Sequence, residues 1–314
     1  MNHSALHPAG LHAAQIAHLG LTFLIVSCAV YVMVIGVLLA VLIRRRRRGS
    51  DPNTLSRSER RALIGVGVAV GITTVVVTAL AISEFVTRRS LEQDTGEPLH
   101  VRIIGHQWWW EVQYSSDSGA GQVQTANELH IPVGRPVQLQ MTSQDVIHSF
   151  WVPNLQGKRD LIPGRTTHIS LVADQPGRYE GQCAEFCGFQ HAKMRIVVDA
   201  QSPADFDAWR QVQLQSAREP VSDLERRGKQ VFENSTCVMC HAIQGSLASG
   251  TIGPDLTHVG SRSSIAAGTL PNTPQTLVLW IANPSAVKPG TAMPSAALSG
   301  EDLRSLATYL ASLK

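Results

Sequence analysis

The segment Cys183-Ala-Glu-Phe-Cys187-Gly-Phe-Gln-His191-Ala-Lys-Met194 places two thiols, one imidazole and one thioether within a single short loop. Soft sulfur ligands combined with imidazole favour copper over magnesium, calcium or manganese. A mononuclear blue-copper site uses one thiolate, whereas two thiolates in the same loop can bridge two copper ions. The loop therefore predicts a binuclear copper centre that transfers electrons.

A symmetric binuclear site needs a second imidazole, and His148 is the best candidate. It follows Asp-Val-Ile at the end of an apolar strand, from which one side chain can reach a neighbouring loop. A zinc site of two Cys and two His is the chemical alternative, but it leaves Met194 without a role. The other histidines of the region have no comparable setting: His100, His106, His130 and His168.

A second redox motif is Cys237-Val-Met-Cys240-His241, which has the spacing of a c-type haem attachment site. The two thiols can form thioether bonds to the haem vinyl groups, and the adjacent imidazole supplies the proximal iron ligand. Because both cysteine pairs have a histidine at ligand spacing, a disulfide framework is a poor explanation for them. The remaining cysteine, Cys28, lies in an apolar segment.

The distal ligand of this haem is expected to be Met293. Only Met239 and Met293 follow Met194 in the chain, and Met239 lies between the attachment cysteines. His258 is the fallback ligand. Ligation by His and Met raises the reduction potential of a haem, which suits a donor to copper.

Two uncharged apolar segments, Leu19–Ile43 and Ala62–Ile82, are each long enough to cross a bilayer as a helix. We expect the spans to cover about 19–43 and 62–86. By the positive-inside rule, the arginine-rich loop between them is cytoplasmic and both termini face outward. No basic segment precedes the first span, so a standard cleaved signal peptide is not evident. The arginines of the loop are Arg44–Arg48, Arg57, Arg60 and Arg61.

The net charge of +3 is unevenly distributed along the chain. The basic excess belongs to the one short loop, so the composition does not indicate nucleic-acid binding. Residues 91–222 are acidic on balance, and an acidic surface can steer a basic protein partner toward the chain.

From about Val101 the pattern changes to short strands separated by Gly, Pro, Asn and Asp, as in a small β-sandwich or barrel. The expected strands are Val101–Tyr114, Glu128–Ile131, Pro136–Thr142, Thr166–Val172, Arg178–Gln182 and Arg195–Val198. The expected helices are Phe206–Gln215, Leu224–Asn234, Pro274–Ala282 and Glu301–Leu313. We therefore expect a membrane hairpin in 1–90, a β-domain in 91–200, a helical linker in 201–222 and an all-α domain in 223–314.

The copper loop, His148, Gly105-His-Gln-Trp-Trp-Trp110 and Asp160-Leu-Ile-Pro-Gly-Arg165 together closely resemble subunit II of cytochrome c oxidase, over roughly residues 15–200. The resemblance implies a cupredoxin-like Greek-key barrel that holds the binuclear centre CuA. It implies that Glu185 also binds magnesium through its side chain, at the interface with subunit I, and that Trp108 accepts electrons from cytochrome c. The implied copper ligands are His148, Cys183, the carbonyl of Glu185, Cys187, His191 and Met194.

Residues 223–314 resemble a class I cytochrome c domain, on the basis of the haem motif, Gly253-Pro-Asp-Leu256, Met293-Pro294 and the C-terminal helix. In that family the carbonyl matching Pro254 accepts a hydrogen bond from the proximal histidine and fixes its orientation. The order of hairpin, CuA domain and cytochrome domain is similar to subunit II of caa-type oxidases, in which cytochrome c is fused to the subunit.

The resemblance implies that electrons pass from an external cytochrome c or cytochrome bc complex through haem c and CuA to subunit I. There oxygen is reduced to water with proton translocation. The implied partners are subunit I, further oxidase subunits and the lipid bilayer of a bacterial plasma membrane, with both redox domains on its outer side. Neither apolar segment contains a histidine, so oxygen reduction requires another chain. A CuA-containing nitric oxide reductase remains the alternative, and the haem motif counts against a copper-handling assembly protein.

Overall fold

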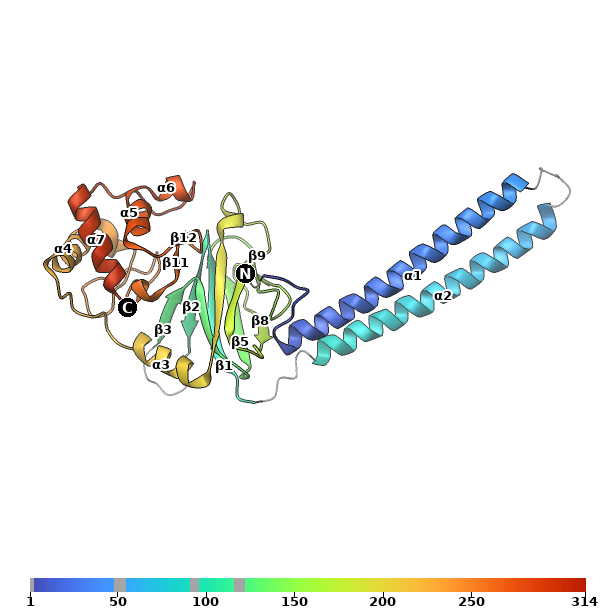
Figure 1. Cartoon of the computed structure of the whole chain (residues 1–314), viewed down its shortest axis with the longest axis horizontal. Coiled ribbons are helices and arrows are strands. Elements are labelled where there is room, and N and C mark those ends of the chain that lie inside the picture. Colours follow the sequence, from blue (N-terminus) through green and yellow to red (C-terminus); the bar gives the residue numbers. More distant parts are fainter. Residues whose placement is uncertain (1–2, 48–54, 91–95, 116–121) are drawn as a thin grey trace. The chain divides into compact units, whose positions relative to one another are not determined.

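The computed structural model describes residues 3–47, 55–90, 96–115 and 122–314, which belong to two compact units (Figure 1). One unit is Ala14–Gln93. The other combines the N-terminal residues up to Ala13 with Asp94–Lys314, and it contains both a β-sandwich and a helical domain.

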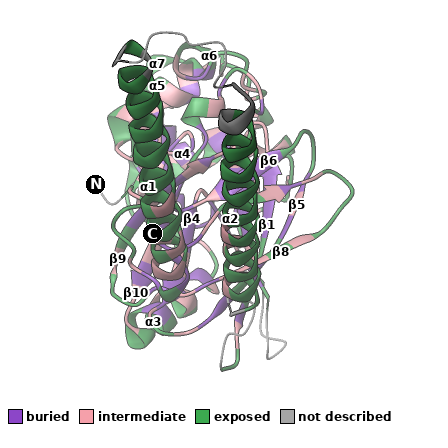
Figure 2. Ribbon diagram, turned by 90° about the vertical axis from the view of Figure 1, so that its right-hand side faces the viewer, coloured by how far each residue is buried: buried purple, intermediate pink, exposed green. Residues whose placement is uncertain are grey.

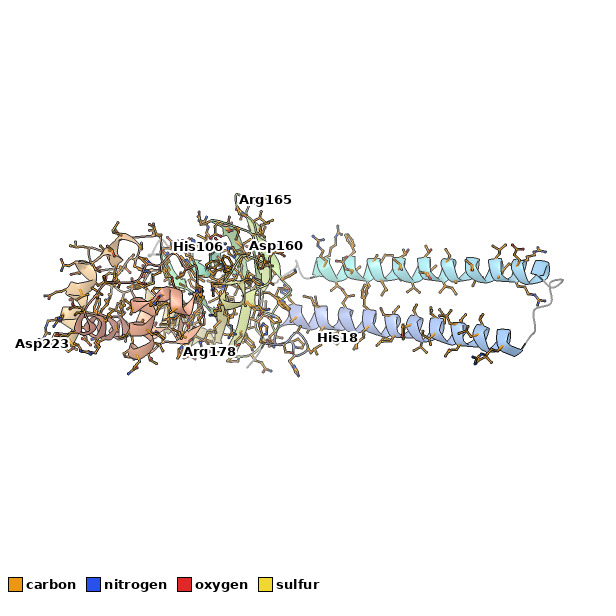
Figure 3. The ribbon with its side chains drawn as sticks, turned by 90° about the horizontal axis from the view of Figure 1, so that it is seen from above. His18, His106, Asp160, Arg165, Arg178 and Asp223 are labelled. Carbon is orange, nitrogen blue, oxygen red and sulfur yellow. The ribbon has the colours of Figure 1, made fainter. Side chains whose placement is uncertain are left out.

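The smaller unit consists of two long helices, α1 (Leu11–Arg47) and α2 (Leu55–Ser90). The first residues of α1, up to Ala13, belong to the larger unit. Both helices are long and apolar enough to cross a membrane, and their apolar stretches are exposed (Figure 2). Side chains project from them along their length (Figure 3). Such extensive exposed apolar surface suits a lipid environment. Both helices extend beyond the expected spans: α1 begins at Leu11 and ends at Arg47, and α2 begins at Leu55 and ends at Ser90.

The β-domain contains two five-stranded sheets, with strand orders β3-β2-β1-β5-β8 and β4-β10-β9-β6-β7. Both sheets contribute to one apolar core. On β1, for example, Leu99, Val101 and Ile103 are buried and the residues between them are exposed, as the two-residue period of a strand requires. The strands are β1 (Leu99–His106), β2 (Trp109–Tyr114), β3 (Val123–Ala126), β4 (Glu128–Pro132), β5 (Val137–Ser143), β6 (His148–Trp151), β7 (Arg159–Leu161), β8 (Thr167–Leu171), β9 (Gly177–Cys183) and β10 (Arg195–Gln201).

The sequence-based strand assignment needs two corrections. The expected strand Val101–Tyr114 is a hairpin, because the chain turns at Gln107 and Trp108 and β2 then pairs antiparallel with β1. The strands β3, β6 and β7 were not expected. They are short, and polar residues such as Ser149 and Asp160 interrupt the hydrophobic alternation on which strand prediction depends.

The helical domain contains α4 (Asp223–Glu233), α5 (Pro274–Ala282), α6 (Pro284–Val287) and α7 (Gly300–Ser312), together with a two-stranded ribbon of β11 (Ser264–Ile265) and β12 (Leu270–Pro271). The helix α3 (Pro203–Gln213) precedes it, and its Phe206 is buried in the apolar core of the β-domain. Ser222 and Glu225 form a capping box at the start of α4. The fold class expected from the sequence is therefore confirmed: an apolar helical hairpin, a β-sandwich and an all-α domain.

The helices α4 and α7 are in close contact at Gly228. A Cβ atom on this glycine would lie 2.1 Å from the carbonyl oxygen of Ser305 and 2.6 Å from Cβ of Tyr309. The backbone of α7 occupies that space, so the side chain at position 228 cannot be larger than hydrogen without separating the helices.

We expect Gly228→Ala to destabilise the helical domain by about 1–3 kcal/mol, because overpacking forces the helices apart. The measurement is hydrogen exchange of the α7 amides in the full chain. Gly300→Ala is the matched control, because a Cβ at Gly300 meets no atom within 4 Å. Equal protection of α7 in both variants would contradict the prediction.

Candidate metal centres

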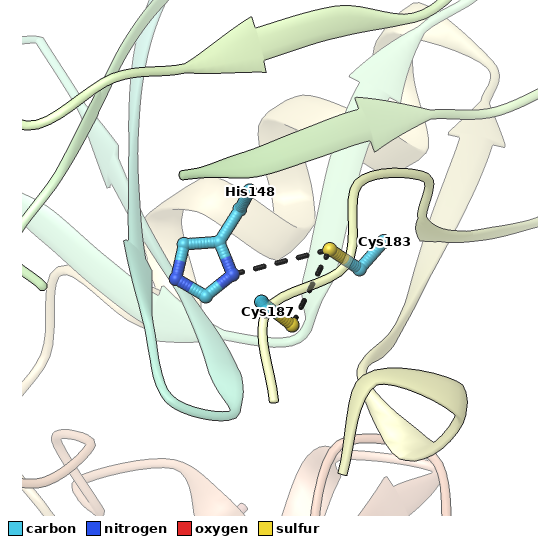
Figure 4. Close-up of side chains that lie close together, drawn as sticks. All are labelled: His148, Cys183 and Cys187. Atoms are coloured by element: carbon cyan, nitrogen blue, oxygen red, sulfur yellow. Dashed lines mark hydrogen bonds between the residues drawn. The ribbon is translucent and has the colours of Figure 1, made fainter. Parts of the chain in front are cut away.

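The copper loop connects the end of β9 with the start of β10, and His148 is the first residue of β6. The strands β6 and β9 are neighbours, and Phe150 lies opposite Cys183 in their register. This pairing brings the imidazole of His148 to the two thiols of the loop (Figure 4). The ligand atoms of His148, Cys183 and Cys187 all lie within 4.8 Å of one another.

The sulfur atoms of Cys183 and Cys187 form the centre of this cluster, 3.7 Å apart. Each sulfur has its own imidazole: Nδ1 of His148 lies 3.9 Å from the sulfur of Cys183, and Nδ1 of His191 lies 3.6 Å from that of Cys187. The thioether of Met194 lies 3.9 Å from the sulfur of Cys187. These residues would hold two metal ions, with both sulfurs at the centre and one imidazole on each side.

Glu185 completes the cluster through its backbone. Its carbonyl oxygen lies 3.2 Å from the sulfur of Cys183, whereas the residue as a whole is exposed. The structure thus brings together all six predicted copper ligands. Thiolate, imidazole and thioether donors fit copper. Magnesium binding by the exposed carboxylate of Glu185 stays a prediction.

The two thiols share their protons unequally. The hydrogen bond between the sulfurs lowers the pKa of Cys183 to about 3, although burial opposes this, and the same contact raises the pKa of Cys187 above its usual range. One thiolate therefore forms readily, and its charge and the buried setting oppose the second. A bound cation removes that obstacle, so the pair is suited to holding metal ions rather than two protons.

Asp145 orients His148. The imidazole Nε2 donates to Oδ1 of Asp145 at 2.8 Å, and backbone amides of Gln107 and Val146 donate to the same carboxylate. Desolvation lowers the pKa of His148, but the hydrogen bonds with Asp145 and Cys183 outweigh it and raise the pKa. Because Nε2 is occupied, Nδ1 faces the sulfurs, which is the geometry of a metal-ligating histidine. Asp145 was not among the predicted site residues, although its position three residues before His148 was a usable signal.

Trp108 lies directly beside the copper loop. Its side chain is 7% exposed, and its Nε1 donates to the carbonyl of Cys187 at 2.9 Å. The side chain of Gln107 donates to the same carbonyl at 2.7 Å. The neighbouring Trp109 stacks on His106 instead, with ring centroids 4.3 Å apart. Trp108 is therefore positioned next to a predicted copper ligand, whereas Trp109 is not.

The alternative histidines are engaged elsewhere or exposed. His106 pairs with Glu111 at 2.9 Å, and His130 stacks on Trp209. His100 and His168 are exposed. Among the described residues, His148 and His191 are the histidines whose ring nitrogens lie beside the cysteine sulfurs.

The predicted haem site is built around His241. Its Nδ1 donates to the carbonyl of Pro254 at 2.7 Å, which leaves Nε2 for an iron ion. Burial lowers the pKa of His241 and favours the neutral imidazole that a metal requires. A Cβ on Gly253 would lie 2.6 Å from the imidazole, so this position accommodates the ring only as glycine. Cys237 and Cys240 lie on the preceding 3₁₀ turn, where the amides of Cys240 and His241 donate to the carbonyl of Cys237.

The contacts and burial of the three candidate distal ligands favour Met293 over His258 and Met239. His258, the fallback ligand, uses Nε2 to contact the carbonyl of Gln215 at 3.0 Å. Met239 is 68% exposed. Met293 is half-buried and packs against the apolar core of the helical domain. Its ligand role stays a prediction.

Comparison with known proteins assigns both domains. Residues 99–201 match the family described as cytochrome C oxidase subunit II, periplasmic domain, and residues 225–314 match the family described as cytochrome c. Cytochrome c oxidase subunit 2 of Alkalihalophilus pseudofirmus is 34% identical over 322 residues, covering 100% of this chain and 91% of the relative. Its counterpart in Bacillus sp. strain PS3 is 30% identical, covering 86% of this chain and 80% of the relative.

Among solved structures, the periplasmic domain of subunit II of cytochrome oxidase from Bradyrhizobium japonicum is 29% identical to this chain. It covers 38% of this chain and 96% of that protein, with a TM-score of 0.36.

We expect Asp145→Ala to weaken copper binding by roughly 10- to 100-fold, because the imidazole of His148 loses the group that orients it. Copper titration of the full chain, followed by near-infrared absorption, measures the effect. Asp174→Ala removes an exposed carboxyl from another loop of the same domain and should bind copper normally. Equal affinity in the two variants would remove Asp145 from this role.

We expect Met293→Ala to yield a high-spin haem, or one with a replacement ligand, while the haem stays covalently attached. The thioether stabilises the reduced iron, so the haem potential should fall. Absorption spectroscopy and a redox titration measure both properties. A low-spin haem with an unchanged potential would place the distal ligand elsewhere.

Proposed function

Because the chain belongs to the subunit II family of cytochrome c oxidase and carries a cytochrome c domain after it, we propose that it is the subunit through which electrons enter a respiratory haem-copper oxidase. The two domains imply binuclear copper and covalently bound haem c. On this proposal electrons pass from an external cytochrome c or cytochrome bc complex to the haem, then to copper, and then to subunit I.

The observation that carries the proposal is the pairing of each cysteine sulfur with its own imidazole, His148 with Cys183 and His191 with Cys187. Bound copper and haem supply one-electron chemistry that no side chain here provides. The protein orients two of the predicted ligands: Asp145 fixes the imidazole of His148, and the carbonyl of Pro254 fixes the imidazole of His241. Because the cytochrome domain is on the same chain, its effective concentration at the copper domain is high and diffusional encounter is unnecessary.

The catalytic site lies on another chain in this proposal. Oxygen reduction at a haem-copper centre needs several imidazoles within the membrane, and the apolar segments Leu19–Ile43 and Ala62–Ile82 contain none. Subunit I would supply them. The exposed carboxylate of Glu185 is the candidate for a shared magnesium ion at that interface.

The N-terminal residues support the outward orientation of both domains. The amides of Ser4 and Ala9 donate to the side chain and the carbonyl of Asn154, at 3.1 and 2.7 Å, and the amide of Asp174 donates to the carbonyl of Ala9. The segments before α1 and after α2 therefore belong to the same compact unit. Both ends of the hairpin then lie on one side of a bilayer, and the arginine-rich loop lies on the cytoplasmic side. We propose a bacterial plasma membrane, with the redox domains outside.

The names of the relatives favour an oxidase over a nitric oxide reductase, and the cytochrome domain counts against a copper-handling assembly protein.

The test uses the complex purified through this chain. We expect a reduced-minus-oxidised spectrum with haem c, copper in excess of that in the catalytic subunit, and oxygen uptake with reduced cytochrome c. Cys183→Ser combined with Cys187→Ser should abolish the extra copper and the oxygen uptake while haem c remains. Nitric oxide consumption without oxygen uptake would overturn the oxidase assignment.

A further inference from the structure

Lys288 is a buried lysine between the β-domain and the cytochrome domain, and its side chain belongs to neither predicted redox site. The residue is 3% exposed. Its Nζ donates to the carbonyls of Trp108 at 2.7 Å, Lys193 at 3.0 Å and Ala266 at 3.4 Å. An ammonium group has three donors, so three carbonyls satisfy it. Two of these carbonyls belong to the β-domain and one belongs to the cytochrome domain.

This position is costly for a cation. Desolvation lowers the pKa of Lys288 to about 7, and repulsion from Lys193 adds to the effect. The three hydrogen-bond partners are neutral carbonyls rather than a carboxylate. An apolar side chain would fill the same volume without the cost of desolvating a charge. The role of Lys288 is therefore to make directional hydrogen bonds across the interface, which an apolar side chain of the same volume could not make.

The segment around Lys288 covers Trp108. A Cβ on Gly290 would lie 3.5 Å from Cη2 of Trp108 and 3.9 Å from the ring of Phe189 in the copper loop. The carbonyl of residue 289 accepts from the side chain of Gln190 at 2.8 Å, and that of residue 287 accepts from Lys193 at 2.8 Å. The chain's own cytochrome domain thus occupies the surface above the indole.

A short connection between the two redox sites passes through this contact. On one side, Met293 follows Gly290 by three residues. On the other side, Nε1 of Trp108 donates to the carbonyl of Cys187, a predicted copper ligand. On this route, the step from Gly290 to the indole of Trp108 is a contact between non-bonded groups of the two domains.

We infer that Lys288 is a positioning residue for electron transfer within this chain: by holding segment 284–290 on Trp108, it keeps the cytochrome domain in electronic contact with the copper loop. The inference rests on the proposed function. One electron would pass from bound haem to bound copper, with no bond made or broken and no change in the protonation state of Lys288. While Lys288 is in place, an external donor reduces the haem and does not reach Trp108.

The test is Lys288→Met in the complete oxidase complex, because methionine keeps much of the volume and removes the donors. Electron transfer from flash-reduced haem c to copper should slow by about tenfold or more, since small displacements of reacting groups are expensive. Hydrogen exchange of the amides in 284–291 and 108–110 should accelerate. The absorption spectra of copper and haem and their midpoint potentials should not change.

Lys193→Met is the matched control. Lys193 donates across the same interface, but it is exposed and makes one such bond, to the carbonyl of residue 287. We expect it to slow the transfer by less than about twofold.

Three results would overturn the inference. An unchanged transfer rate in Lys288→Met would do so, as would equal slowing in Lys193→Met. Altered copper or haem spectra would show that Lys288 supports a metal site and not the contact between domains. If Lys288→Met does not assemble, Gln190→Ala takes its place: faster exchange in 284–291 with slower transfer supports the inference, and an unchanged rate overturns it. Absence of copper or haem c from the unaltered complex would instead refute the proposed function.

Discussion

Two cysteine sulfurs held 3.7 Å apart in a buried setting are the constraint on which the rest of the β-domain depends. Like charges at this distance and away from water cannot both persist without compensating cations. The fold provides for such cations by placing further metal-binding donor atoms around the two sulfurs. Register between β6 and β9 supplies one imidazole, the loop supplies the other, and a carbonyl and a thioether complete the set.

Groups that bind no metal are as necessary to this arrangement as the donors themselves. Asp145 fixes which nitrogen of His148 faces the sulfurs, and Gln107 and Trp108 both hold the carbonyl of Cys187. In the cytochrome domain, the carbonyl of Pro254 orients His241 by a hydrogen bond, and Gly253 leaves space for its imidazole because it has no Cβ. Both sites therefore combine a short local motif with orienting groups from more distant parts of the chain.

The sequence predicts the local motifs well and the distant contacts poorly, for a physical reason. Ligand spacing within a loop is a property of a few consecutive residues, so Cys183, Cys187 and His191 could be grouped without a structure. The lengths of apolar runs and of amphipathic helices are local in the same sense. The turn at Gln107, the short strands β6 and β7 and the burial of Lys288 depend on partners far along the chain. Lys288 and Trp108, for example, are 180 residues apart, and no sequence pattern near either residue indicates their contact.

The contacts of Asn154 with the N-terminal segment have a consequence for biogenesis. The described residues before α1 pack against a domain whose strands β1 to β10 all follow α2 in the chain. These residues therefore have no β-domain partners until the rest of that domain has been synthesised. Residues 1–18 carry no Asp, Glu, Lys or Arg, so packing this segment against the β-domain desolvates no side chain of these four types. Once the chain around Asn154 and Asp174 has folded, the residues before α1 and the residues after α2 belong to one compact unit, so the two ends of the chain that flank the hairpin fold together.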